Sequence, residues 1–305
     1  MKILTSTVGM TEDDWREHRR KGIGGSDAAA ALGQSKWKSQ LQLYMEKRGE
    51  YEPTIRNPEA VYWGKSLEEP IAVRFQELNP DVEIRRVQAI LVHPEHDFML
   101  ANIDREIVCP TGNGVLEIKT ANAYLADKWE GEDVPIDYVL QVQHYLAVTG
   151  YKFAWVCCLI GGQRYVQRYI ERDEAIIESL CQGEAAFWRC VQEGTPPVWD
   201  GSEASEAFLS VLHPTPEEGK VVALSDELLE VAAKYAELDA RYKEYGKLVS
   251  GIEKERNACK EILVSALGDA EFGSVGQYRI GYKLVTRKES YSPASSFRRF
   301  SFKAA

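Results

Sequence analysis

LANIDREIVCPTGNGVLEIK, residues 100–119, contains two strand-like segments joined by a turn with Gly, Pro and Asn. In a strand, alternate side chains share a face, so Glu117 and Lys119 point the same way while Ile118 points into the core. Asp104 ends the first segment. We therefore expect two carboxylates and an ammonium group to converge at one edge of a sheet.

This group of side chains suits metal-assisted hydrolysis of a phosphodiester. Carboxylates are ligands for hard ions such as Mg²⁺ or Mn²⁺. The lysine can orient or help to deprotonate an attacking water, or offset the charge of the phosphate. The pattern is short, and a Glu-x-Lys pair on an exposed edge strand explains the triplet equally well when it stands alone. The neighbouring segments therefore decide between the two interpretations.

Residues 63–75 are predicted to form a helix with one buried side, because Leu67, Ile71 and Phe75 recur at helical spacing. Glu68 lies beside that apolar face. It either reaches toward the sheet or stays in solvent, where most glutamates are found.

A second helix is predicted over residues 138–150 and ends at Gly150. Tyr138, Gln141 and Tyr145 share one face of it. An amide and a phenol beside a metal site can hold phosphate oxygens or a water without competing for the metal. The alternative is an ordinary amphipathic helix.

A glycine-rich turn with basic residues before it lies at residues 19–27, RRKGIGGSD. A helix that starts at Ser or Asp after such a turn presents free backbone N–H groups and the positive end of its dipole. The segment is a candidate phosphate seat. By itself, however, the pattern favours a capped helix with a flexible turn.

Taken together and in this order, the segments resemble the YqaJ-like viral recombinase family, the phage-type exonucleases related to lambda exonuclease. The resemblance covers roughly residues 12–192. The matching pieces are residues 22–27 (GIGGSD), 35–37 (SKW), 64–70 (GKSLEEP), 93–95 (HPE), 101–104 (ANID), 116–120 (LEIKT) and 141–145 (QVQHY).

The resemblance implies a restriction-endonuclease-like α/β core, with a central mixed sheet flanked by helices. It also implies a Mg²⁺- or Mn²⁺-dependent deoxyribonuclease with two ions, which digests double-stranded DNA from its ends and degrades the 5′-ended strand. Asp104, Glu117 and the backbone carbonyl of Ile118 would then bind metal. Lys119 would act on the water, and Glu68 would bind or support the second ion.

The same resemblance assigns the remaining site residues. Gln141 and Tyr138 would lie beside the scissile phosphate. Ser26 and Arg19 would hold a terminal 5′-phosphate, and Arg20, or the lysine that follows it, could serve instead of Arg19. The expected partners are a single-strand annealing protein and further copies of the chain in a trimeric ring. The long C-terminal extension departs from lambda exonuclease, so the ring geometry does not carry over directly.

Composition sets limits on the class of protein. The 305-residue chain can form one large domain or two smaller ones. It has no apolar run of about eighteen residues and no secretory signal at its start, so we expect no membrane span and a cytoplasmic location in a bacterial host, with phage or prophage origin. Six cysteines without a C-x-x-C motif disfavour zinc ribbons, redox dithiols and iron–sulfur clusters.

The net charge of −10 is unusual for a DNA-binding protein, but local fields govern binding. The charge is also uneven along the chain. Residues 277–305 contain seven basic residues and one acid, so that segment carries +6 and the rest of the chain −16.

Three regions are predicted along the chain: a nuclease core (1–193), a Pro- and Gly-containing linker (194–223) and an extension (224–305). In the extension, apolar residues step by four and three from Leu224 to Ala266, as in a coiled coil, and Arg256 alone breaks the set. The helix either oligomerises or packs on its own nuclease domain. Gly246 and Gly251 indicate a bend or a helical hairpin.

A small β-hairpin is predicted at residues 271–286, followed by a basic, Phe-containing tail at 290–303. The tail suits either a grip on single strands or a terminal strand.

Two alternatives to an exonuclease stay open. An endonuclease of the same fold would use the same chemistry but would cut closed-circular DNA. A non-catalytic scaffold for DNA binding and recombination would have no need of the intact Asp, Glu and Lys set, which argues against it.

Overall fold

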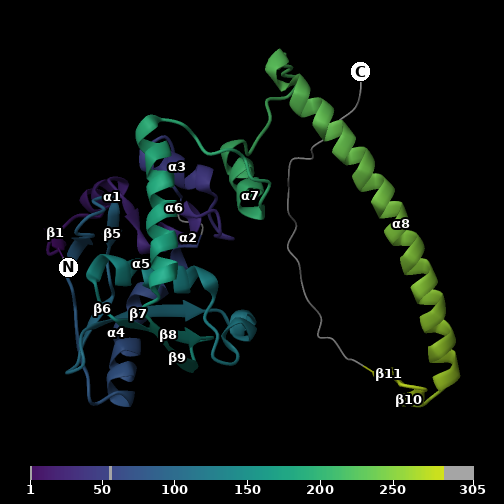
Figure 1. Cartoon of the computed structure of the whole chain (residues 1–305), viewed down its shortest axis with the longest axis horizontal. Helices are drawn as coiled ribbons and strands as arrows, with labels where there is room; N and C mark the ends of the chain where they lie inside the picture. The colour runs from purple at the N-terminus through teal and green to yellow at the C-terminus, as the bar shows by residue number, and fades with distance from the viewer. Residues whose placement is uncertain (1, 55–56, 285–305) are drawn as a thin grey trace. The chain divides into compact units, whose positions relative to one another are not determined.

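The computed structural model describes residues 2–54 and 57–284, so the predicted basic tail at 290–303 lies outside the described residues. The chain divides into two compact units between His213 and Pro214. Figure 1 shows the helices and strands of both units.

The first unit is built on a five-stranded mixed sheet with the order β3-β6-β7-β8-β9. Only the central pair, β7 and β8, is parallel, and the outer pairs are antiparallel. These strands are β3 (Glu83–Arg85), β6 (Arg105–Val108), β7 (Gly114–Ala121), β8 (Phe153–Ile160) and β9 (Arg164–Glu171). The parallel pairing sets Glu117 opposite Val156 and Lys119 opposite Cys158.

A second sheet of the first unit has the order β1-β4-β5-β2. Its strands are β1 (Lys2–Ser6), β4 (Ala89–Val92), β5 (Met99–Ala101) and β2 (Ile23–Gly24). The glycine-rich turn of the sequence forms β2, which pairs in parallel with β5. This pairing joins the turn to the chain just before Asp104.

Helices cover both faces of the five-stranded sheet. Helix α4 (Pro58–Leu78) packs its apolar face against one side, where Phe75 meets Leu116 and Ile118. Helix α5 (Ile136–Thr149) packs against the other side through Val142 and its neighbours (Figure 1). The mixed α/β fold predicted from the sequence is confirmed.

The remaining helices of the first unit surround this core. They are α1 (Glu12–Arg20), α2 (Gly25–Ala31), α3 (Gln40–Arg48), the 3-10 helix η1 (Ala123–Trp129), α6 (Glu174–Glu193) and α7 (Glu203–Leu212). Helix α2 is almost entirely buried, because its run of small alanines lets α5 and α6 approach closely.

Helix α7 differs from the linker predicted for residues 194–223. Ser202 caps the start of α7, and Phe208 is buried in the cluster that also contains Tyr44 and Phe187. The first compact unit therefore reaches His213. The short apolar face of α7 shows little periodicity in the sequence, and its stability comes from burial against α3.

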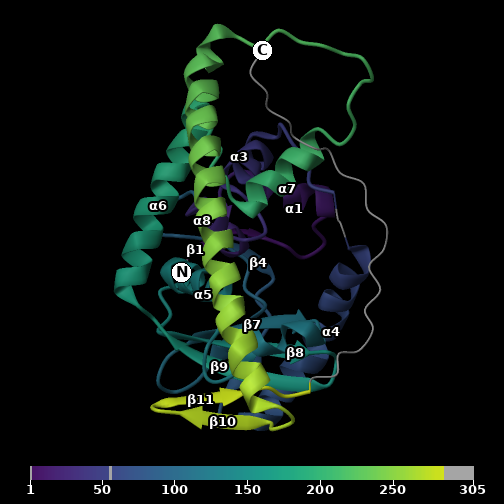
Figure 2. The same ribbon diagram turned by 90° about the vertical axis from the view of Figure 1, so that its right-hand side faces the viewer.

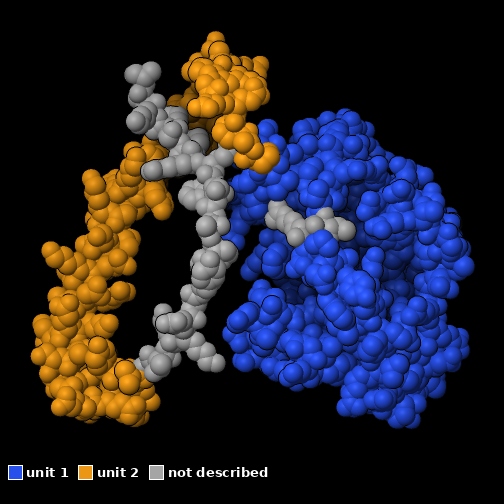
Figure 3. Space-filling model, turned by 180° about the vertical axis from the view of Figure 1, so that it is seen from behind, with its two compact units in different colours: residues 1–213 blue, residues 214–305 orange. Residues whose placement is uncertain are grey.

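The second unit consists of a short 3-10 helix, η2 (Asp226–Leu228), the long helix α8 (Leu229–Leu267) and a hairpin of β10 (Phe272–Val275) and β11 (Tyr278–Gly281). Figure 2 shows the hairpin at the end of α8, and Figure 3 distinguishes the two units by colour. Helix α8 continues through Gly246 and Gly251, so the helical hairpin, one of the two alternatives predicted for these glycines, is wrong. The β-hairpin prediction is confirmed, with its turn at Gly276.

In the part of the chain that the structure describes, no helix is both long and apolar enough to cross a membrane.

A buried polar pair links α5, α6 and β5. His144 Nδ1 lies 2.8 Å from Glu184 Oε1, and His144 Nε2 lies 2.8 Å from the carbonyl oxygen of Leu100. Both side chains are fully buried. Since each ring nitrogen faces an oxygen, the imidazolium form satisfies both contacts. Burial alone would lower the pKa of His144, but Glu184 and Leu100 outweigh it and raise that pKa above its usual value.

We predict that His144 makes the first unit more stable at mildly acidic than at alkaline pH. With a raised folded-state pKa, its contribution is fully present below the unfolded pKa of about 6.5 and is lost as pH rises through the folded value, at up to about 1.4 kcal/mol per pH unit. Urea unfolding from pH 6 to pH 9 should show this slope. His144→Gln should be less stable at pH 6 and flatter across the range, and an unchanged slope would contradict the assignment.

Candidate active site

An acidic pocket of about 290 Å³ lies between β7 and the first turns of α4. It contains the metal-site residues predicted from the sequence. Its lining is Val61, Gly64, Lys65, Glu68, Asp104, Glu117, Ile118, Lys119 and Thr120. Asp104 directly precedes β6, which begins at Arg105. Because β6 pairs antiparallel with β7, Asp104 lies beside β7.

Asp104 is held against the backbone of β7. Its Oδ2 accepts a hydrogen bond of 2.8 Å from the amide of Ile118. Burial raises the pKa of the Asp104 carboxyl, although this hydrogen bond and the charge of Lys119 act in the opposite direction. Ile118 itself points into the core, as predicted from the strand alternation.

Glu117 and Lys119 share the other face of β7 and touch each other, with Lys119 Nζ 2.5 Å from Glu117 Oε1. Gln141 of α5 joins them: its Nε2 donates to Glu117 Oε1 at 2.7 Å, and its Oε1 accepts from Lys119 Nζ at 3.0 Å. The second oxygen, Glu117 Oε2, is buried and has no hydrogen-bond partner among the described residues. A buried carboxylate oxygen without a donor is the kind of atom that a bound cation would satisfy.

Burial and like charge disfavour the ionised form of Glu117. Burial and the Asp104 carboxylate raise the pKa of Glu117 to about 8, in spite of the adjacent Lys119. Burial would lower the pKa of Lys119, but Glu117 and Asp104 outweigh it and raise it. The lining of the pocket thus holds three carboxyl groups and two lysines, Lys65 and Lys119.

Glu68 lines the same pocket from α4, where burial and Asp104 raise its pKa. Among the described residues, no group of three or more His, Cys, Asp or Glu side chains could hold a metal ion by itself. An ion next to Asp104 and Glu117 would therefore need a further oxygen, which the carbonyl of Ile118 or water can supply. Oxygen donors of this kind fit Mg²⁺ or Mn²⁺ and do not favour a soft metal.

Tyr138 and Tyr145 complete the α5 side of the site. The ring of Tyr138 lies 4.9 Å from Lys119 Nζ, and it stacks on Trp129 of η1. Tyr145 is buried, and its hydroxyl accepts from Gln141 Nε2 at 3.0 Å. Of the residues that share this helical face, Tyr145 contacts Gln141 and Tyr138 lies over Lys119, so Tyr145 and Lys119 hold Gln141 in place.

A larger pocket of about 500 Å³ lies beside the first and contains Arg19, Arg20 and Ser26. Arg19 Nη2 donates to Ser26 Oγ at 2.8 Å. Arg20 instead pairs with Glu52 at 2.7 Å, so Arg19 and not Arg20 is joined to Ser26. The two pockets share Val61 and Lys65 of α4, which makes them neighbouring parts of one surface.

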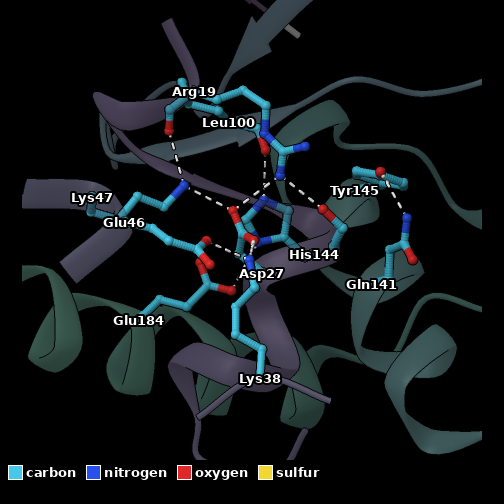
Figure 4. A network of polar contacts seen from close by, with 11 residues as sticks. Arg19, Asp27, Lys38, Glu46, Lys47, Leu100, Gln141, His144, Tyr145 and Glu184 are labelled. Atoms are coloured by element: carbon cyan, nitrogen blue, oxygen red, sulfur yellow. Dashed lines mark hydrogen bonds and ion pairs between the residues drawn. The ribbon is translucent and has the colours of Figure 1, made fainter. Parts of the chain in front are cut away.

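Asp27 organises the basic side of this larger pocket, and sequence reasoning assigned it no role (Figure 4). It is 4% exposed and pairs with Lys47 at 2.8 Å, Arg19 at 3.0 Å and Lys38 at 3.3 Å. Burial alone would raise the pKa of Asp27, but the three cations hold it well below its usual range. Lys38 also pairs with Glu46 at 2.6 Å.

The sequence signal for Asp27 is weak. Its place after Ser26 suggests a helix cap, and the lysines that meet it come from later segments. Only the pairing of β2 with β5 and the packing of α2 on α3 bring these groups together. The outcome is a cluster of three cations around one buried anion at the base of the pocket.

Comparison with known proteins gives a consistent result. The model of the YqaJ-like viral recombinase domain matches residues 14–152. The uncharacterized protein YqaJ of Bacillus subtilis (strain 168) is 36% identical over 287 residues, which cover 93% of this chain and 87% of that protein.

Solved structures share the fold of the first unit. The alkaline exonuclease LHK-Exo of Laribacter hongkongensis superposes with a TM-score of 0.51 and 19% identity, over 66% of this chain and 99% of that chain. The same protein in complex with dAMP gives a TM-score of 0.51 and 18% identity, over 66% and 98%. The restriction-endonuclease-like fold predicted from the sequence is thus confirmed.

We predict strong coupling between Asp27 and Lys47. Asp27→Ala should destabilise the first unit by about 3–5 kcal/mol, because it leaves the buried ammonium of Lys47 without its anion. The double variant Asp27→Ala/Lys47→Met should lose less than the sum of the single variants. Urea unfolding followed by tryptophan fluorescence measures all three.

The exposed pair of Arg20 and Glu52 is the matched control. Glu52→Ala should cost less than about 1 kcal/mol, since Glu52 is largely in solvent. Additive effects of Asp27→Ala and Lys47→Met would show that the two buried groups do not depend on each other.

Proposed function

The chain belongs to the YqaJ-like viral recombinase family, and from this premise we propose that it is a phage-type exonuclease that hydrolyses double-stranded DNA from its ends. The observation that carries the proposal is the pocket in which Asp104, Glu117 and Lys119 meet beside an unsatisfied carboxylate oxygen. The alkaline exonuclease of similar fold supports the same reaction class.

A divalent hard cation, Mg²⁺ or Mn²⁺, fits the acidic pocket. Asp104, Glu117 through Oε2, and the carbonyl of Ile118 would hold one ion, and Glu68 would support a second. When bound, such ions supply Lewis-acid stabilisation of the phosphoryl oxygens and favour a nucleophilic water. The buried, partnerless Glu117 Oε2 is the structural support for this assignment.

The protein's own groups position the reacting atoms. Lys119 keeps its ammonium at the edge of the pocket, where Glu117 and Gln141 fix its direction. In that form it orients a water and offsets charge on the phosphate. Gln141 and Tyr138 present an amide and a phenol next to it, which can bind non-bridging phosphate oxygens.

The larger pocket would bind the end of the substrate. Arg19 is joined to Ser26, and Lys38 and Lys47 lie behind it around Asp27, so a terminal 5′-phosphate would meet a guanidinium, a hydroxyl and a positive field. Because this pocket shares α4 residues with the acidic pocket, one strand could occupy both. This arrangement supports digestion of the 5′-ended strand.

The partners follow from the same proposal. Resection of a 5′-ended strand leaves a 3′ single strand, which a single-strand annealing protein would take up for recombination. A ring of several copies, with three as the family resemblance implies, would keep the enzyme on its duplex.

We predict Mg²⁺-dependent digestion of linear duplex DNA and no cutting of the same DNA as a covalently closed circle. Lys119→Ala should lower the rate about 10²–10³-fold, because it removes one preorganised charge, while DNA binding is retained. Glu117→Gln should also abolish the rise in thermal midpoint that Mn²⁺ gives to the wild type. Gel electrophoresis, fluorescence anisotropy and calorimetry provide the three measurements.

The outcomes separate the alternatives. Cutting of the circle would make the protein an endonuclease of the same fold. Binding without cutting of either form, in the presence of metal, would favour the recombination scaffold, and a normal rate for Lys119→Ala would refute the mechanism.

We predict that Arg19→Ala reduces the preference for 5′-phosphorylated over 5′-hydroxyl ends by about ten- to a hundredfold, as expected for the loss of a charged hydrogen bond of about 1.5–3 kcal/mol. Comparing both ends on the same variant cancels any loss of folded protein. Arg74→Ala is the control, since Arg74 pairs with Glu77 on the exposed side of α4. An unchanged preference in Arg19→Ala would place the 5′-phosphate elsewhere.

A further inference from the structure

Helix α8 carries an apolar stripe that the described residues of its own unit do not cover. No residue of α8 is buried, although the helix is 39 residues long. The stripe repeats every three and four residues, and its central side chains are between 40% and 79% exposed. They include Tyr242, Tyr245, Val249, Ile252 and Leu263. A helix of about 58 Å with this pattern is stabilised mainly by packing of its apolar face against a partner.

We propose that α8 pairs with α8 of a second copy of this chain, as a parallel, in-register, two-stranded coiled coil. The repeat of the stripe is 3.5 residues, which keeps one seam facing a partner along a left-handed supercoil. The proposal concerns the second unit alone and does not depend on the reaction of the first.

The charges beside the seam select the parallel arrangement. In a parallel, in-register pair, Lys234 comes opposite Asp239 of the partner subunit, and Glu255 comes opposite Lys260 of the partner subunit. The two-fold symmetry of the pair gives each attraction twice. No like charges face each other at the positions on either side of the apolar stripe. Asp239 also binds Lys243 within its own helix at 2.6 Å, and a carboxylate can accept both bonds.

An antiparallel pair with full overlap is less favourable. It would bring Asp239 opposite Glu253 of the partner subunit, and symmetry would repeat that repulsion. Only Arg241 and Glu255 would attract each other across the helices. The charge pattern therefore favours the parallel pair.

Polar groups on residues of the apolar stripe, which forms the seam of the coiled coil, favour a pair of helices over a bundle of three. Arg256 and the hydroxyls of Tyr242 and Tyr245 must reach solvent or a partner, and a two-stranded seam leaves its edges open. Glu255 of the partner subunit flanks Arg256 in the parallel pair. A third helix would close the seam over these groups.

Cys259 provides a direct test. It is a seam position and an exposed free cysteine, so the parallel pair sets it against Cys259 of the partner subunit, whereas the antiparallel pair does not. Mild oxidation of the full-length protein should give a disulfide-linked dimer on a non-reducing gel. Cys259→Ser should remove that band. Tyr242→Cys in the Cys259→Ser background should restore it, because a parallel pair also aligns residue 242 with itself.

Two matched variants separate the seam from the rest of α8. Ile252→Asp places a charge in the seam and should lower the cross-linking yield at least tenfold. Lys254 lies on the face of α8 that points away from the seam. Lys254→Asp should therefore leave the cross-linking yield within twofold of the wild-type yield. Light scattering before oxidation should give the mass of two chains, or of six chains where two of the three-chain rings proposed above are joined through α8.

The proposal would be overturned by the absence of a Cys259 cross-link. A cross-link that persists at full yield in Ile252→Asp would overturn it as well, because the contact would then be collisional. A three-chain particle would overturn the two-stranded form, and a monomer would show that the stripe packs within its own chain.

Discussion

Burial of the Glu117 carboxylate in the middle of β7 is the constraint on which the first unit depends. A charge at that depth is costly unless it is paired. Strand β7 itself brings Lys119 and α5 brings Gln141 as partners, whereas Asp104, just before β6, adds a like charge that raises the pKa of Glu117. The parallel contact with β8 places the carboxylate in the centre of the sheet, away from the edges. One oxygen, Glu117 Oε2, is left without a hydrogen-bond partner among the described residues.

The second constraint is the separation of charge within an acidic protein. Cations are gathered around Asp27, while carboxylates are gathered around β7, and α4 contributes to the lining of both. The two neighbouring pockets therefore differ in charge on one surface. The overall charge of −10 would repel DNA from the remaining surface.

Local periodicity predicted much of this arrangement. Alternation along β7 placed Glu117 and Lys119 on one face, and helical spacing on α5 placed Gln141 beside them, because both patterns depend only on neighbouring residues. The strands β1 and β2, the role of Asp27 and the pair of His144 with Glu184 depend on partners far along the chain. Helix α7 lies between Pro- and Gly-containing segments, and its ten residues form a helix because Phe208 is buried.

Helix α4 contains Pro70, which has no amide hydrogen to offer the carbonyl one turn earlier. The proline lies on the exposed side, so solvent can satisfy that carbonyl. Ahead of it are Val61, Lys65 and Glu68, which line the pockets, and after it are Ile71 and Phe75, which fill the core. The proline thus separates a half whose side chains line the pockets from a half that packs in the core. The series of backbone hydrogen bonds along α4 is interrupted at the point where the helix passes from one task to the other.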